Sequence, residues 1–153
     1  MTDARTFLSP GDVFDALTED ECRVLLAGRT FGRVGVTSGG LPVILPVRYL
    51  YADGEIRFRT GGGTKLRAAE SGDVVAFEVD SYDGETGAGW SVLVLGRATV
   101  VTATADHDGL PMFDPKDAGG RRDHDIHLHC ELITGRRLVT ARSGASASTP
   151  SAE

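Results

Sequence analysis

The sequence lacks several patterns that mark particular classes of protein. It has two cysteines, Cys22 and Cys130, which lie far apart and form no Cys-x-x-Cys motif. We therefore expect two buried thiols in a reducing compartment and no disulfide. No basic run exceeds two residues, and the formal net charge is −6. Both features argue against general binding to nucleic acids, which needs a positively charged track along the phosphate backbone.

Long apolar stretches are missing as well. The N-terminus has no apolar signal-peptide core, and no window approaches the ~20 apolar residues of a membrane-spanning helix. We therefore expect a cytoplasmic protein that does not contact a membrane. The remaining composition is ordinary for a globular protein. The chain has 153 residues, 41% of them hydrophobic and 25% charged, which suits a single core.

One domain is expected, flanked by two less patterned ends. Residues 1–16 have weak periodicity and are predicted to form an N-terminal surface segment. Residues 17–139 carry the alternating apolar patterns and form the predicted domain. Residues 140–153 are rich in serine and alanine without a core pattern, so we predict a disordered tail.

Short segments with alternating apolar and polar residues dominate the predicted domain. A turn signal at Asp53-Gly54 separates two of them and indicates a tight hairpin, and the first three strands are predicted to form a meander. Many short strands with little helix between them predict a mainly β protein, a small barrel with short helices. The predicted strands are residues 31–37, 41–50, 56–60, 73–80, 89–101 and 124–139.

Two short helices are predicted. Thr18 and Glu21 form a capping box for the first helix, which ends at Gly28. The second helix follows Gly61-Gly62-Gly63 and starts at Thr64-Lys65. Backbone N–H groups at a helix start attract anions, and a lysine there adds a full charge. The sequence therefore indicates a phosphate site at this helix start, although a solvated lysine gives the same pattern.

These motifs, in this order and spacing, resemble the FMN-binding split β-barrels related to pyridoxamine 5'-phosphate oxidase. The family pattern is a strand with a basic residue, a strand end of the form aromatic-x-Thr, and a small hydroxyl residue followed by lysine. Here these are Arg48, Phe58-Arg59-Thr60 and Thr64-Lys65. The segment Gly89–Ala98 is similar to the family's strand that flanks the flavin. The resemblance covers roughly residues 17–139 and implies a split barrel that pairs as a homodimer, with the flavin in a groove between the subunits.

The resemblance also implies which residues hold the flavin. The strand around Arg48 would lie along the edge of the flavin ring, and the residues from Arg59 to Lys65 would hold its phosphate. Trp90 takes the place of a contact from a neighbouring strand, although it is equally typical of a core or interface aromatic. Arg57 is interpreted as structural. The implied cofactor-binding residues are Val47, Arg48, Tyr49, Arg59, Thr60, Thr64, Lys65, Trp90 and Ser91.

The histidines raise a metal or haem site as an alternative. His127 and His129 share one strand face, but no third ligand with a known spacing accompanies them. A polar strand face is therefore preferred, and no metal is predicted. No nucleophile–base pair can be built from the spacing, so the catalytic residues stay unassigned. The histidines considered are His107, His124, His127 and His129.

The substrate half of the family pattern is absent from the C-terminal strand. Gly135-Arg136-Arg137 is not followed by the arginine-x-histidine segment of true pyridoxamine 5'-phosphate oxidases. The sequence therefore predicts an FMN-dependent oxidoreductase on an unidentified small molecule. A deazaflavin-dependent reductase and a non-enzymatic flavin- or haem-binding module stay open as alternatives. The segment Val92–Leu95 supports the homodimer independently, because a strand apolar on both faces fits a wall covered by a second subunit.

Overall fold

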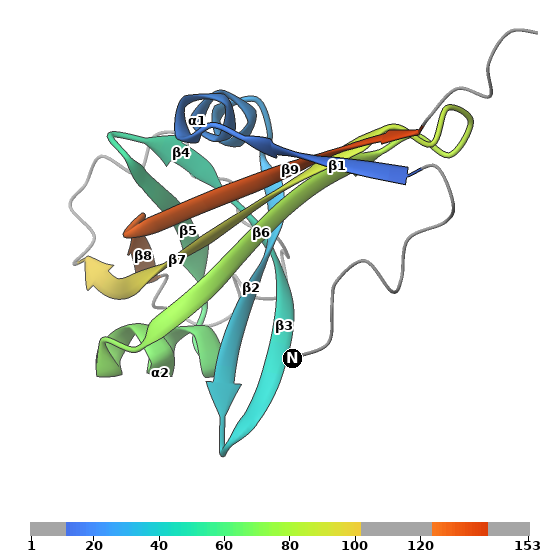
Figure 1. Cartoon of the computed structure of the whole chain (residues 1–153). Coiled ribbons are helices and arrows are strands. Elements are labelled where there is room, and N and C mark those ends of the chain that lie inside the picture. Colours follow the sequence, from blue (N-terminus) through green and yellow to red (C-terminus); the bar gives the residue numbers. More distant parts are fainter. Residues whose placement is uncertain (1–11, 102–123, 141–153) are drawn as a thin grey trace, which may run out of the picture.

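The computed structural model describes residues 12–101 and 124–140. Within these ranges the chain forms nine strands and two helices (Figure 1). The helices are α1 (Glu19–Ala27) and α2 (Thr64–Ser71). The strands are β1 (Asp12–Leu17), β2 (Phe31–Ser38), β3 (Leu41–Arg48), β4 (Leu50–Ala52), β5 (Glu55–Thr60), β6 (Val74–Tyr82), β7 (Gly89–Val101), β8 (His124–His129) and β9 (Leu132–Thr140).

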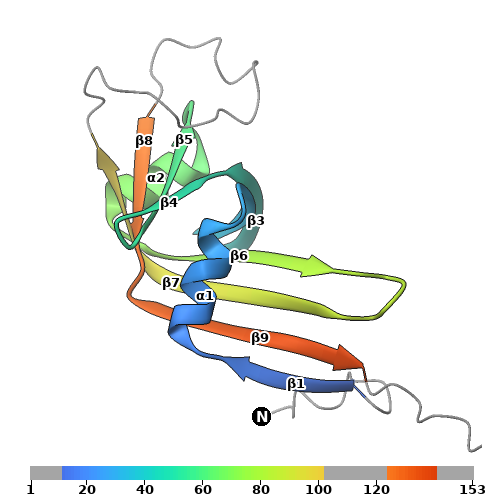
Figure 2. The ribbon, with the colours of Figure 1, turned by 90° about the horizontal axis from the view of Figure 1, so that it is seen from above.

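The strands form one curled antiparallel sheet, the split β-barrel that the sequence predicts. Its order is β3-β2-β6-β7-β8-β5-β4, and β9 pairs with both β7 and β1. Figure 2 shows β6, β7, β9 and β1 side by side, with β8, β5 and β4 beyond them at one end. The mainly β fold class is thereby confirmed.

β7 organises the sheet because it belongs to both halves. One of its edges pairs with β6 over Gly89–Arg97, and the other edge pairs first with β9 and then with β8. The change of partner comes opposite Gly96, where a Cβ atom would lie 1.7 Å from the carbonyl oxygen of His129. Glycine alone tolerates so close an approach of two backbones. Gly96 therefore lets β7 pass from one half of the sheet to the other.

The apolar core fills the inside of the curl. α1 contributes the buried Cys22 and Leu26, and α2 packs against β7 with the buried Ala68 and Ala69. Alternation along each strand sends every second side chain inward. The other residues buried in this core are Val34, Val36, Val47, Tyr49, Ile56, Phe58, Val75, Phe77, Val79, Val92, Val94, Ala98, Ile126 and Leu128.

Local signals in the sequence are confirmed by the structure. The Thr18 hydroxyl accepts a hydrogen bond from the Glu21 N–H at 3.3 Å, and the Glu21 carboxylate accepts one from the Thr18 N–H at 2.8 Å. α1 then ends at Gly28. Asp53 and Gly54, with φ of 54° and 76°, form the two-residue turn between β4 and β5. Neither described helix is long and apolar enough to span a membrane.

Three predicted segments differ from the structure, each because of pairing between distant segments. Residues 41–50 form two strands, since β3 pairs with β2 while β4 pairs with β5, so the predicted three-strand meander is wrong. The predicted strand 124–139 is divided into β8 and β9 at the crossing opposite Gly96. Part of the predicted N-terminal surface segment is the edge strand β1, which pairs with β9. Residues 1–11 and 141–153 lie outside the described residues.

Candidate functional site

Seven of the nine expected cofactor contacts come from two stretches of the chain: the end of β3 with the residue that follows it, and the end of β5 with the start of α2. β3 leads directly into β4, which pairs with β5, and β3 itself contacts β5. Extending the register that pairs Leu50 with Arg57 places the exposed Arg48 across from Arg59, on the outward face. α2 begins immediately after the glycine loop that ends β5. We call the group Arg48, Arg59, Thr60, Thr64 and Lys65 the β5–α2 corner.

The start of α2 has the features of an anion site. Gly62 and Gly63 have φ of 138° and 81°, values that favour glycine, and the buried Thr60 hydroxyl donates to the Gly62 carbonyl at 3.1 Å. Gly63 is the N-cap, and this end has no side-chain cap among the described residues, whereas α1 is closed by its capping box. Lys65, half-buried, is the second residue of α2. The first-turn N–H groups and the positive end of the helix dipole can therefore serve an external anion.

Arg59, near the end of β5, carries an unused donor. Its side chain is 10% exposed, and its Nε donates to Asp125 Oδ1 at 3.0 Å. Its Nη2 is buried and has no hydrogen-bond partner among the described residues. Arg57, by contrast, is paired with Asp53 at 2.8 Å and with Glu55 at 3.4 Å, which supports its structural interpretation. Sequence reasoning missed Asp125, because only the pairing of β5 with β8 brings it opposite Arg59.

Val47 and Tyr49 lie at the edge of the corner with their side chains turned into the core. Tyr49 is 1% exposed, and its hydroxyl donates to the Leu26 carbonyl at 2.7 Å. Burial raises the pKa of this phenol above its usual value, so it stays neutral. The Tyr49 N–H donates to the Thr30 carbonyl at 2.9 Å. A contact from Tyr49 to a cofactor would therefore have to use its own carbonyl oxygen.

Trp90 and Ser91 lie far from the corner within one protomer. The corner's Arg59 pairs with Asp125, which pairs with Val101 at the end of β7, whereas Trp90 is near the start of this strand. The eleven steps from Trp90 to Val101 span about 36 Å along the strand, at ~3.3 Å per residue. The two neighbours also point to opposite faces of β7. The structure therefore does not bring these two predicted residues together with the other seven.

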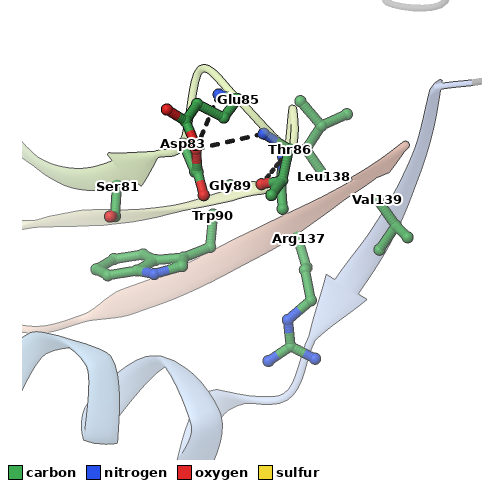
Figure 3. A pocket seen from close by; sticks show the side chains of 10 residues that line it. Ser81, Asp83, Glu85, Thr86, Gly89, Trp90, Arg137, Leu138 and Val139 are labelled. Carbon is green, nitrogen blue, oxygen red and sulfur yellow. Dashed lines mark hydrogen bonds between the residues drawn. The ribbon is translucent and has the colours of Figure 1, made fainter. Parts of the chain in front are cut away.

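A pocket of about 810 Å³ surrounds the Trp90 end of β7. Figure 3 shows the indole of Trp90 and the guanidinium of Arg137 on the same side of the sheet. Asp83, in the turn between β6 and β7, accepts hydrogen bonds from the N–H groups of Glu85 at 2.9 Å and Thr86 at 3.3 Å, which lower its pKa. Sequence reasoning missed Arg137 here, since the register of β7 with β9 is not readable from the sequence.

His127 and His129 share one face of β8, as predicted, and both contact a residue that sequence reasoning missed. The Glu55 carboxylate lies 3.0 Å from Nδ1 of His127 and 2.9 Å from Nδ1 of His129. Among the described residues, no group of three or more histidine, cysteine, aspartate or glutamate side chains is placed to hold a metal ion. Glu55 therefore joins β5 to the two histidines of β8 across the paired strands. His107 lies outside the described residues.

Comparison with known proteins places this geometry in a family. Residues 18–137 match the family model described as pyridoxamine 5'-phosphate oxidase. A curated relative, the uncharacterized protein Rv0080 of Mycobacterium tuberculosis (strain ATCC 25618 / H37Rv), is 42% identical over 128 residues, which cover 80% of this chain and 84% of that protein.

Solved structures agree with this assignment. The FAD binding protein from Mycobacterium smegmatis matches with a TM-score of 0.61 and 31% identity, over 82% of this chain and 98% of that chain. A FAD-binding protein (mll6688) from Mesorhizobium loti matches in fold with a TM-score of 0.69 and 21% identity, over 84% of this chain and 98% of that chain. With its curled sheet and a family match over most of its length, the chain belongs to the pyridoxamine 5'-phosphate oxidase family of split β-barrels.

Proposed function

We propose that this protein binds a flavin at the β5–α2 corner, with FMN as the expected form, and acts as a flavin-dependent oxidoreductase on a small molecule. The observation that carries the proposal is the buried Nη2 of Arg59, which has no partner among the described residues. Arg59 comes four residues before Gly63, the N-cap of α2, and this helix end has no side-chain cap among the described residues. A buried donor without an acceptor is costly, and an anion at this place would satisfy it.

The residues of the corner fit the phosphate group of a flavin nucleotide. Arg48 and Lys65 supply positive charge, Arg59 a buried N–H donor, and the first turn of α2 backbone N–H groups. Such donors hold a phosphate dianion through charge-assisted hydrogen bonds. When bound, the flavin supplies the electron transfer, and the protein binds it, orients it and excludes water. Both FMN and FAD carry this phosphate, so the corner suits either.

The comparisons support a flavin without fixing its form. The FAD binding protein from Mycobacterium smegmatis is 31% identical to this chain. FMN is proposed because the motifs Phe58-Arg59-Thr60 and Thr64-Lys65 resemble the FMN-binding members of the family. The substrate stays unspecified, since the corner explains cofactor binding alone.

We further propose that two copies pair through the outer face of the sheet. Register places Ile44, Ala76, Leu95 and Leu132 in one row across the strands from β3 to β9. Ile44 is 72% exposed and Leu132 is 51% exposed, and Leu93 adds to this apolar face. We call these five residues the apolar row. Such a continuous apolar surface suits a second copy.

The position of Ser91 supports the same assembly. Ser91 lies on the outward face of β7, beside Arg136 of β9, in the half of the sheet away from the corner. Ser91 cannot reach the flavin site of its own protomer. In a homodimer it could instead complete the flavin site of the second copy. This arrangement accounts for two groups of expected contacts at opposite ends of β7.

An absorbance spectrum of the purified protein, followed by titration of FMN fluorescence against stripped protein, tests the proposal. Flavin bands and saturable quenching of FMN are expected. Consumption of a reduced nicotinamide by the FMN-loaded protein, with an electron acceptor present, would then support an enzyme over a binding module. A haem or deazaflavin spectrum, or no binding of FMN and FAD, would overturn the flavin assignment.

A further inference from the structure

The pocket at the end of the β6–β7 hairpin has a chemistry of its own. Trp90 is half-buried, and the guanidinium of Arg29 lies 5.4 Å from the centre of its ring. Arg137, the cross-strand partner of Trp90, projects on the same side (Figure 3). Its ion pair with Glu21 spans 3.9 Å, at the outer limit of such a contact, and its side chain is half exposed. An aromatic platform and an accessible guanidinium thus line one cavity of about 810 Å³.

These groups match the parts of a nucleotide. An indole face stacks with a planar base, and such stacking contributes roughly 1–3 kcal/mol per base in proteins that bind nucleic acids. A guanidinium binds a phosphate through paired charge-assisted hydrogen bonds. The cavity volume lies within the range of roughly 300–1,000 Å³ that is usual for small-molecule sites. A nucleotide would therefore fit the pocket in both size and chemistry.

The hairpin turn supplies groups for the sugar. Asp83 and Glu85 line the same pocket, and the backbone hydrogen bonds to Asp83 keep its carboxylate ionised. Carboxylates accept hydrogen bonds from ribose hydroxyls in dinucleotide sites. They also repel long polyphosphates, so one phosphate, or the single AMP half of a dinucleotide, is favoured over a triphosphate.

We propose that this hairpin pocket binds a purine nucleoside monophosphate group, with the base on Trp90 and the phosphate on Arg137. The site is separate from the β5–α2 corner within the protomer, because it lies at the opposite end of β7. The group could belong to a free mononucleotide or to the AMP half of a reduced nicotinamide dinucleotide. Both share the same recognition chemistry.

Trp90 is the single tryptophan of the chain, so its fluorescence reports on this pocket directly. We would titrate flavin-free protein with AMP, with adenosine, and with reduced nicotinamide dinucleotide. AMP is expected to quench Trp90 saturably and to bind at least about tenfold more tightly than adenosine, since adenosine lacks the phosphate. Tighter binding of the dinucleotide than of AMP would identify the dinucleotide as the source.

Two neighbouring variants sharpen the test. Arg137→Gln removes the charge in the pocket and is expected to weaken AMP about tenfold, whereas Arg136→Gln, on the opposite face of β9, should leave the affinity unchanged. Equal effects of the two variants, or no quenching by millimolar AMP, would overturn the proposal. Because AMP carries no flavin, Lys65→Ala should not change the affinity of the protein for AMP. A failure of the nucleotide proposal can therefore be told apart from a failure of the proposed flavin site.

Discussion

Arg59 divides its guanidinium between two environments: Nε donates to Asp125 at 3.0 Å, and Nη2 is buried without a partner among the described residues. Arg59→Lys keeps a positive charge for Asp125 and removes the second donor. We expect it to weaken FMN binding about tenfold, in line with one lost charged hydrogen bond, with little change in the urea midpoint. Titration of flavin fluorescence and urea unfolding check both parts.

Arg59→Leu is the contrasting variant. It removes the ion pair with Asp125 and should lower the free energy of unfolding by about 1.5–3 kcal/mol, as expected for one lost charged hydrogen bond. If Arg59→Lys binds FMN as the parent does, with unchanged stability, Nη2 does not contact the cofactor.

Lys65→Ala should weaken FMN binding by about 1.5–3 kcal/mol, roughly 10- to 150-fold in Kd, because it removes a charged donor at the start of α2. Arg97→Ala is a matched control, since it removes a charge of the same sign from an exposed side chain of β7 that pairs with Glu131, outside the corner. Titration of flavin fluorescence compares the three proteins. Equal dissociation constants for Lys65→Ala and the parent would remove Lys65 from the site.

Leu132→Glu should dissociate the proposed homodimer, because an interface with two-fold symmetry would bury the new carboxylate twice. Val24→Glu on α1, also an exposed apolar position, should leave the assembly intact. Analytical ultracentrifugation at micromolar concentration measures both variants. A parent protein that is monomeric with flavin bound would exclude the shared site.

The protein should not oxidise pyridoxamine 5'-phosphate at a useful rate. Arg136 and Arg137 lie on opposite faces of β9, and no histidine follows them in the sequence to form the expected arginine-x-histidine pair. Positioning of the substrate can supply several kcal/mol of the barrier, and the groups for it are missing. Incubation of FMN-loaded protein with this substrate and oxygen should form aldehyde more slowly than roughly 0.01 per second. Faster turnover would show that another segment holds the substrate phosphate.

Gly96→Ala should destabilise the fold by about 3 kcal/mol or more, because a Cβ atom cannot lie 1.7 Å from the His129 carbonyl oxygen without moving the backbone. Gly84→Ala, where no atom lies within 4 Å of the added Cβ, should change stability by less than about 0.5 kcal/mol. Urea unfolding of both variants compares the two positions. Similar losses at Gly96 and Gly84 would contradict the close crossing of β7.

Features that depend on neighbouring residues could be predicted from the sequence. The capping box of Thr18 and Glu21 and the Asp53-Gly54 turn were readable because their hydrogen bonds and φ angles are set locally. Most of the β5–α2 corner lies within one short stretch from Arg59 to Lys65, so the end of β5, the glycine loop and the start of α2 could be predicted for the same reason.

Features that depend on strand pairing could not be predicted. The partnership of Arg59 with Asp125 spans 66 residues and needs the register of β5 with β8. The position of Arg137 beside Trp90 needs the register of β7 with β9. Alternation along one strand says which side chains share a face, but it does not say which strand lies alongside.

The pairing of β1 with β9 joins the two ends of the described chain, with Asp12 opposite Thr140. A contact between residues so distant in sequence must wait until the intervening segments have formed, because loop closure is costly before those segments hold the ends near each other. The pairing of β1 with β9 should therefore be among the last parts of the sheet to form during folding. Among the described strands, β1 pairs with β9 alone, so it can detach without breaking any pairing within the remaining sheet.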